Sequence, residues 1–181
     1  MNNIIPHPLN GTRDDFGWRY LDTSNNLTCP WYTIGCLEWL NTLNLKNMSI
    51  FEYGCGISTM WWKDKTEKCA GVDDNLKWSN GCIVPLLNDD TIDKKRYIES
   101  CLNEKYDIII IDGIYRNECL LYALKCINNG GYLIWDNWNQ QTVSEHMPSD
   151  KSKKLLNEYE ITVYKEPNHI DWKTAVFQIK E

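Results

Sequence analysis

The sequence lacks the patterns that would make its cysteines structural or metal-binding. It has eight cysteines in 181 residues, but no C-x-x-C pair and no Cys/His cluster at zinc spacing. Several cysteines fall inside apolar runs, where a free thiol behaves as a small hydrophobic group. We therefore expect a reduced protein in the cytoplasm, or in the host cytoplasm if the asparagine-rich composition reflects a viral genome.

An excess of positive charge and long apolar runs are also missing. Nineteen Lys and Arg residues against 25 Asp and Glu give a formal charge of −6. Binding to duplex nucleic acid relies on basic residues that neutralise phosphates. No segment approaches the ~18 apolar residues of a membrane span, and the first residues have neither the basic start nor the apolar run of a signal peptide. The sequence thus predicts no nucleic-acid partner and no membrane partner.

What the chain does have is enough apolar residues for one buried core. Hydrophobic residues make up 43% of it and charged residues 24%, and nine tryptophans exceed what a core requires. Residues 1–29 are polar and rich in Asn and Asp, which predicts an irregular arm. Residues 30–181 have the size and composition of a single domain.

Strand-like and helix-like segments alternate from residue 30 onward. Strands are predicted over 49–54, 69–73, 106–112 and 132–137, and helices over 31–43, 57–67 and 117–127. The four consecutive isoleucines within 106–112 suit a strand that is buried on both faces. The alternation therefore predicts an α/β fold, with a mostly parallel sheet and helices on both of its faces.

Two parts of the chain depart from this alternation. Residues 159–165 and 174–179 alternate apolar and polar side chains around a turn, which predicts an antiparallel hairpin at one sheet edge. The residues between 73 and 106 are too few for a complete helix–strand–helix passage. We therefore expect the third strand of the sheet to be very short or missing.

A glycine turn followed by an acidic residue is the sharpest local signal. Residues 51–62, FEYGCGISTMWW, predict a strand that ends in Gly54-x-Gly56 and enters a helix, where backbone can approach a ligand closely. A tight turn alone would explain this pair, since Thr59 stands where a third glycine would complete a dinucleotide motif. Asp73, at the end of the next strand, can accept both hydroxyls of a ribose. Together they predict an adenosine-containing ligand.

The motif E-x-G-x-G-x-S-T with its strand-end acid resembles the cofactor site of class I S-adenosylmethionine-dependent methyltransferases. The likeness continues through YDIIIIDGIYR (106–116) and GGYLIWDN (130–137) to the closing hairpin. More narrowly, the chain is similar to small methyltransferase-like proteins with F-E-x-G-x-G-x-S-T, I-D-G-x-x-R and D-N motifs. The resemblance implies a Rossmann-like, seven-stranded sheet of order 3-2-1-4-5-7-6.

The resemblance also implies S-adenosylmethionine (SAM) as the cofactor and assigns residues to its parts. Glu52, Gly54 and Gly56 would line the methionine part, with Ser58 and Thr59 beside it at the start of the helix. Asp73 would bind the ribose, and Asp74 or Asn75 would border the adenine. Asp112 would end the fourth strand under the reactive sulfonium.

A second group of polar residues, Asp112 with Asp136 and Asn137, ends two adjacent predicted strands. Such an oxygen set suits Mg²⁺ or Ca²⁺ and resembles the ligands of catechol and macrocin-type O-methyltransferases. A metal there would lower the pKa of a substrate hydroxyl, which makes Asp112 and Asp136 catalytic candidates. The alternative is that Asp136 and Asn137 only cap the strand. The catechol enzymes have a lysine base where this chain has Tyr115.

Four further residues are candidates for the acceptor side. His146 and His169 lie in loops that would border the acceptor, and a histidine is the usual base for a hydroxyl, although surface histidines without a role are more common. Arg116 would bind an anionic acceptor group or simply be solvated. Trp138 would contact the substrate.

The leading hypothesis is therefore a SAM-dependent O-methyltransferase that acts on a small-molecule or glycan acceptor. A sugar hydroxyl is favoured because Trp135, Trp138 and Trp172 fall near the loops expected to frame the acceptor, with Trp31 at the start of the preceding helix. The alternatives are a nicotinamide-dependent oxidoreductase, disfavoured by the missing third glycine, and a methyltransferase fold that binds without turnover.

Overall fold

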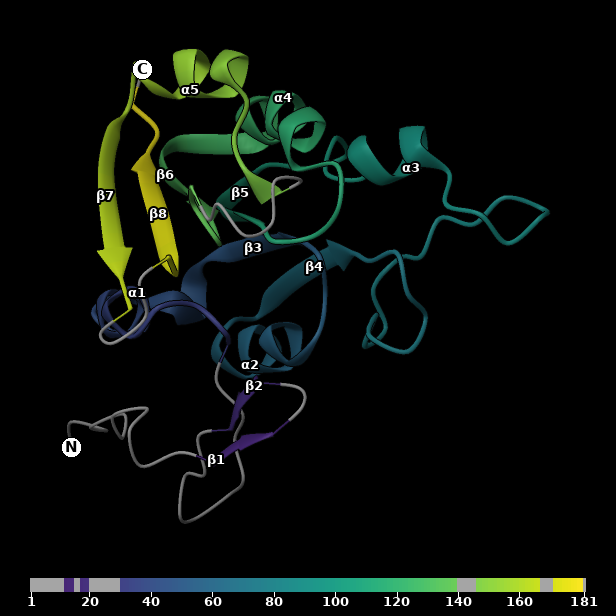
Figure 1. The fold of residues 1–181 in the computed structure, drawn as a ribbon, viewed down its shortest axis with the longest axis horizontal. Helices are drawn as coiled ribbons and strands as arrows, with labels where there is room; N and C mark the ends of the chain where they lie inside the picture. Colours follow the sequence, from purple (N-terminus) through teal and green to yellow (C-terminus); the bar gives the residue numbers. More distant parts are fainter. Residues whose placement is uncertain (1–11, 15–16, 20–29, 140–145, 167–170, 181) are drawn as a thin grey trace.

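The computed structural model describes residues 12–14, 17–19, 30–139, 146–166 and 171–180. Six of its strands form one mixed sheet in the order β4-β3-β5-β6-β8-β7 (Figure 1). In chain order these strands are β3 (Ser49–Tyr53), β4 (Lys68–Val72), β5 (Tyr106–Ile111), β6 (Ile127–Trp135), β7 (Glu160–Lys165) and β8 (Lys173–Gln178). The pairs among β3, β4, β5 and β6 are parallel, and β8 runs antiparallel to both β6 and β7. The predicted Rossmann-like sheet with its closing hairpin is confirmed.

The seven-stranded order is not confirmed, because no described residue forms a strand beyond β4. Ile83 makes a single isolated parallel bridge with Val72 instead. The Asp73 N–H donates to the Ile83 carbonyl at 2.9 Å, and the Ile83 N–H donates to the Gly71 carbonyl at 3.1 Å. The next bond of a parallel ladder would need an N–H at residue 85, which is Pro85 and has none. The segment between β4 and α3 therefore leaves the sheet, as Figure 1 shows.

Helices cover both faces of the sheet. In chain order they are α1 (Ile34–Leu40), α2 (Ile57–Lys65), α3 (Lys94–Ile98), α4 (Arg116–Cys126) and α5 (Asp150–Leu156). The isoleucines of β5 divide between the two faces: Ile108 and Ile110 pack in the cluster that includes α1 and α2, whereas Ile109 and Ile111 pack in the cluster that includes α4. All four are fully buried, which confirms a strand covered on both sides.

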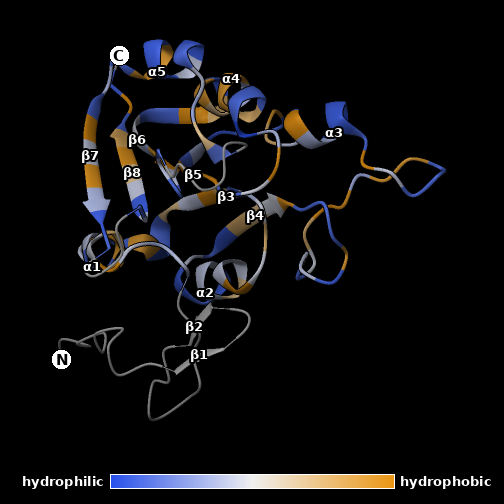
Figure 2. Cartoon of the chain, in the orientation of Figure 1, coloured by the Kyte–Doolittle hydropathy of each residue, from blue (hydrophilic) through white to orange (hydrophobic). Residues whose placement is uncertain are grey.

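Two helices were not predicted from the sequence, and both depend on side-chain caps. Asp93 accepts the Arg96 N–H at 3.1 Å before α3, and Ser149 accepts the Ser152 N–H at 3.1 Å before α5. α5 is hydrophilic over most of its length and lies at the surface (Figure 2). No helix in the described ranges is long and apolar enough to cross a membrane; α4, for example, has 11 residues.

Some element boundaries differ from prediction. Helix α1 begins at Ile34 rather than at residue 31, because the backbone N–H groups of Thr33 and Ile34 donate to the side chains of Thr174 and Glu166. Residues 30–33 therefore form an irregular segment, with bends at Trp31 and Tyr32, before the helix. Within the arm expected to be irregular, β1 (Thr12–Asp14) and β2 (Gly17–Arg19) form a short antiparallel hairpin.

Candidate functional site: a cavity at the carboxyl ends of the strands

A cavity of about 620 Å³ lies where the parallel strands end, between β4 and β6. This is the edge at which open α/β sheets bind their ligands. The predicted site residues that line it are Gly54, Gly56, Ser58, Asp73, Asp74, Asp112, Arg116, Asn137 and His146. Glu52, Thr59, Asp136 and Trp138 are not among its lining residues. His169 lies outside the described residues.

The glycine turn forms one wall of the cavity, and Gly54 is required there by its backbone. Gly54 has φ +87°, and a Cβ at this position would lie 2.5 Å from the Gly113 backbone nitrogen. Any other residue would therefore be strained and would push β3 and β5 apart. A Cβ on Gly56 would meet no atom within 4 Å, so Gly56 leaves open space beside the turn.

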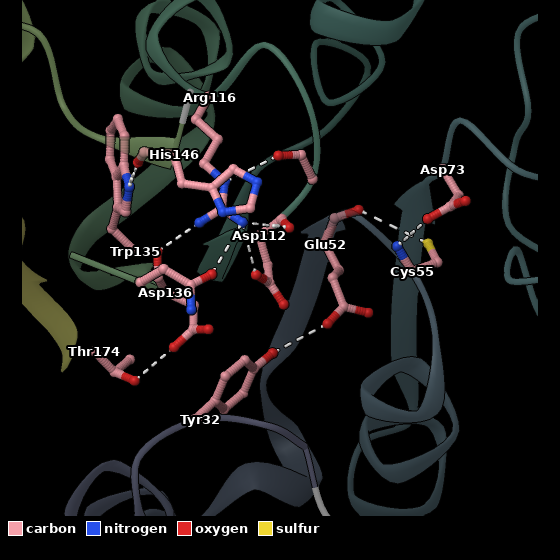
Figure 3. A network of polar contacts seen from close by, with 12 residues as sticks. Tyr32, Glu52, Cys55, Asp73, Asp112, Arg116, Trp135, Asp136, His146 and Thr174 are labelled. Atoms are coloured by element: carbon pink, nitrogen blue, oxygen red, sulfur yellow. Dashed lines mark hydrogen bonds and ion pairs between the residues drawn. The ribbon is translucent and has the colours of Figure 1, made fainter. Parts of the chain in front are cut away.

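Asp73 is a buried carboxylate fixed by two backbone groups at the cavity. One oxygen, Oδ2, accepts the Cys55 N–H at 2.8 Å, and the other, Oδ1, accepts the Asn75 N–H at 2.7 Å (Figure 3). Burial raises its pKa. Each oxygen has a further lone pair, so the carboxylate has the chemistry to accept a pair of neighbouring hydroxyls.

Glu52 differs from its predicted role, because its side chain lies beneath the glycine turn rather than in the cavity. It is fully buried, accepts the Tyr32 hydroxyl at 3.0 Å through Oε1 and accepts the Thr59 hydroxyl at 2.5 Å through Oε2. Thr59 in turn accepts the Gly56 N–H at 3.0 Å. Glu52 and Thr59 therefore support the turn from behind, and neither is among the residues that line the cavity.

Arg116 is neither solvated nor free for a substrate anion, because backbone and side-chain oxygens surround its guanidinium. The side chain is 1% exposed. Its Nε donates to the Gly113 carbonyl at 2.9 Å, its Nη1 donates to the Asp136 carbonyl, and its Nη2 donates to Asp112 Oδ1 at 3.0 Å (Figure 3). Arg116 thus ties the loop after β5 to the end of β6.

The residues proposed as metal ligands do not fit a metal site. Arg116 Nη2 lies 3.0 Å from Asp112 Oδ1 and 3.3 Å from Asn137 Oδ1, so a fixed positive charge already bridges these two oxygens. Asp136 turns away and accepts the Thr174 hydroxyl at 2.6 Å. Burial, and then the charge of Asp112, raise the pKa of Asp136 to about 8, which disfavours the ionised form that a metal needs. Asp136 is a buried structural group.

Metal removal should therefore leave the site unchanged. We expect treatment with EDTA to alter neither the melting temperature nor any affinity for S-adenosylhomocysteine (SAH), the product form of the cofactor that the sequence motif implies, because Arg116 supplies the positive charge at Asp112. Differential scanning fluorimetry and calorimetry in EDTA or millimolar Mg²⁺ measure both. A melting temperature that rises with added Mg²⁺, and not with matched NaCl, would contradict this assignment.

His146 lines the cavity as a neutral imidazole. Burial, and then the charge of Arg116, lower its pKa to about 4. Its backbone carbonyl accepts the Trp135 indole N–H at 3.1 Å, which fixes the chain at this point. At neutral pH the ring has one nitrogen lone pair available to a proton donor.

The tryptophans at the cavity are only partly those predicted. Trp138 packs edge-on against Trp135 and Phe177 and is 8% exposed, because it turns back onto the sheet after β6. Trp31, which was expected near the acceptor, lines the cavity together with Trp78, and each is 41% exposed.

Comparisons with known proteins give a fold but no sequence relative. No protein-family model and no curated protein matches the sequence. The N-methyltransferase NodS from Bradyrhizobium japonicum WM9 is similar in structure, with a TM-score of 0.52 and 13% identity over 81% of this chain and 96% of its own. The O-methyltransferase TomG from Streptomyces achromogenes, involved in tomaymycin synthesis and solved with SAM, has a TM-score of 0.55 and 15% identity over 80% of this chain and 78% of its own.

A methyltransferase-like protein from Silicibacter pomeroyi DSS-3 agrees, with a TM-score of 0.52 and 17% identity over 83% of this chain and 88% of its own. The three proteins align with most of the sheet and its helices at low identity, so the likeness concerns architecture. The chain has the Rossmann-like fold of the class I SAM-dependent methyltransferases.

Proposed function

We propose that the protein is a SAM-dependent methyltransferase that transfers the methyl group to an oxygen. The observation that carries the proposal is one cavity with the glycine turn and Asp73 at one end and His146 at the other. Asp73 would accept the ribose hydroxyls, and the acidic lining favours a cofactor with a positive sulfonium. A nicotinamide cofactor gains no specific support, because Thr59 replaces the third glycine.

The transfer would be an in-line displacement. The substrate oxygen forms a bond to the methyl carbon as the carbon–sulfur bond breaks, and the sulfur keeps the bonding electrons. The hydroxyl proton then passes to His146, whose neutral ring can accept it. Because the lowered pKa makes His146 a weak base, the rate would depend mainly on alignment of oxygen, carbon and sulfur.

For the acceptor we propose a sugar hydroxyl, carried by a small molecule or a glycan. Trp31 supports this, because an indole face in the cavity wall can pack against the C–H groups of a sugar ring. The support comes from fewer indoles than the sequence suggested, since Trp135 and Trp138 belong to the core and Trp172 is not among the residues that line the cavity. Of the four indoles expected near the acceptor, Trp31 lines the cavity.

Replacing each cavity tryptophan separately should split acceptor binding from cofactor binding. We expect Trp31→Ala to raise the acceptor KM about tenfold and to leave SAH affinity within about twofold, because the lost contact is to the acceptor. Trp78→Ala should do the opposite, because Trp78 follows Asp73 and Asn75 on the cofactor side. The two indoles are equally exposed, so each variant is the control for the other. Equal effects of both variants on SAH affinity would contradict the assignment.

A thermal-shift comparison tests the proposed function itself. SAH should stabilise the protein by an amount that grows with its concentration above the Kd, and NAD should not. Stabilisation by NAD without any by SAH would replace the proposal with the oxidoreductase alternative. Binding of SAH without turnover on any sugar acceptor would support a binding module.

A further inference from the structure

Glu52 connects two segments that reach the cavity from different parts of the chain. It lies one residue before the end of β3, and its two carboxyl oxygens accept hydroxyl groups from opposite sides. The carboxyl is therefore the shared partner of the Tyr32 and Thr59 hydroxyls. Figure 3 shows Glu52 between the Tyr32 ring and the chain at Cys55.

On one side, Tyr32 places the segment that contains Trp31. Its hydroxyl donates to Glu52 Oε1 at 3.0 Å and accepts the Trp62 indole N–H at 3.2 Å. The next two residues are bound as well, since the Thr33 N–H donates to Thr174 at 3.0 Å and the Ile34 N–H donates to Glu166 at 2.9 Å. Trp31 is thus an exposed indole on a segment whose backbone is fixed.

On the other side, Thr59 places the glycine turn. Its hydroxyl oxygen donates to Glu52 Oε2 at 2.5 Å and accepts the Gly56 N–H at 3.0 Å. Gly56 is the last residue before α2, and it lines the cavity. A third glycine at position 59 could make neither bond, so the threonine has a specific use here.

We propose that Glu52 is a positioning residue that sets the glycine turn, through Thr59, and the Trp31 segment, through Tyr32, in one fixed relation across the cavity. This rests on the proposed function, because it assigns the turn to the cofactor and Trp31 to the acceptor. One carboxyl would then govern both sides of the transfer, although it touches neither ligand.

The charge of Glu52 should decide whether this arrangement persists. Burial raises the pKa of Glu52 to about 8, against which its hydrogen bonds with Ser58, Thr59 and Tyr32 act. Above that pH the ionised carboxylate can accept both hydroxyls, whereas below it a proton occupies one of the two oxygens. The titratable groups facing it are Tyr32 before α1, Cys55 in the glycine turn, Cys69 on β4 and Asp112 at the end of β5.

The experiment measures SAH affinity by calorimetry at pH 7 and pH 9 for the wild type, Glu52→Gln and Glu52→Ala. Glutamine keeps the shape, but its amide nitrogen is a donor, so like the protonated acid it can accept only one of the two hydroxyls. We expect Glu52→Gln to match the wild type at pH 7, where Glu52 is mostly protonated, and Glu52→Ala to bind at least tenfold more weakly than the wild type. At pH 9 the wild type should gain up to about tenfold in affinity, since about nine-tenths of Glu52 is then ionised and accepts both hydroxyls, whereas Glu52→Gln should not. SAH itself and Asp136 titrate in the same way in the wild type and in Glu52→Gln, so their effects cancel when the pH dependence of the two proteins is compared.

Two further variants separate the two connections. Thr59→Val should weaken SAH binding, and Tyr32→Phe should raise the acceptor KM without changing SAH affinity. Equal pH dependence of the wild type and Glu52→Gln, or wild-type affinity in Glu52→Ala, would overturn the inference alone. Failure of the wild type to bind SAH at either pH would overturn the proposed function and, with it, this inference.

Discussion

The Asp73→Ala variant should bind SAH at least about 100-fold more weakly than the wild type. Hydrogen bonds to a charged group contribute about 1.5–3 kcal/mol each, and this carboxylate would lose those to both ribose hydroxyls. It would also release the Cys55 and Asn75 N–H groups that now fix the cavity wall. Calorimetric titration with SAH gives the affinity directly.

The neighbouring carboxylate is the matched control. Asp74 also lines the cavity, but it is exposed, so Asp74→Ala should change SAH affinity by less than about fivefold. Both variants remove one negative charge from the same wall, and the difference between them therefore reports position rather than charge. If they weaken SAH binding equally, Asp73 does not bind the ribose.

The Arg116→Lys variant should lose about 2–5 kcal/mol of stability, because lysine keeps the positive charge but leaves buried oxygens without a donor, at about 1–3 kcal/mol for each. A lysine ammonium cannot reach the carbonyls of Gly113 and Asp136 together with the Asp112 carboxylate, because it lacks the planar fork of donors. For a chain of this length the melting temperature should fall by roughly 10 °C. Chemical and thermal denaturation measure the two quantities.

Arg96→Lys serves as the reference for this change, because Arg96 on α3 is exposed. Its stability should stay within about 0.5 kcal/mol of the wild type. Should Arg116→Lys prove as stable as Arg96→Lys, the hydrogen bonds of Arg116 would contribute nothing net to folding. The same result would reopen the site for a metal, since Asp112 and Asn137 would then not depend on the guanidinium.

The sheet could be predicted because its signals are local. The isoleucine run of β5 and the glycine turn after β3 each specify their own conformation, and strand-end residues such as Asp73 and Asp112 then fall at one edge by topology alone. The absence of a further strand beyond β4 in the described residues could also be predicted, since the chain between residues 73 and 106 is short. The pairing ends at Pro85 because this residue falls at a position of the ladder that needs an N–H. The sequence pattern does not reveal that pairing register.

The directions of individual side chains could not be predicted in the same way. Glu52 turns behind the glycine turn because Tyr32, 20 residues earlier, donates to it. Trp138 follows a strand end, where a side chain can face the ligand or the core, and the neighbouring Phe177 decides for the core. Such choices depend on partners distant in sequence, whereas a motif describes only its own residues.

Because the chain after β4 pairs with the sheet only through the isolated bridge at Ile83, the two walls of the cavity are not equally well fixed. Toward β6, strand pairing and the guanidinium of Arg116 fix the wall. Beyond β4 the chain is held by that bridge and by contacts of Asn80, whose side chain donates to the Gly56 carbonyl at 2.6 Å and whose own carbonyl accepts the Lys63 ammonium at 2.6 Å. Leu76, which is 69% exposed, adds little packing there. Local opening needs least free energy where buried contacts are fewest. We therefore expect amide hydrogen exchange to be faster in residues 74–92 than in β5 and β6, and the proposed cofactor to enter and leave past the β4 edge, beyond which no described residue forms a strand.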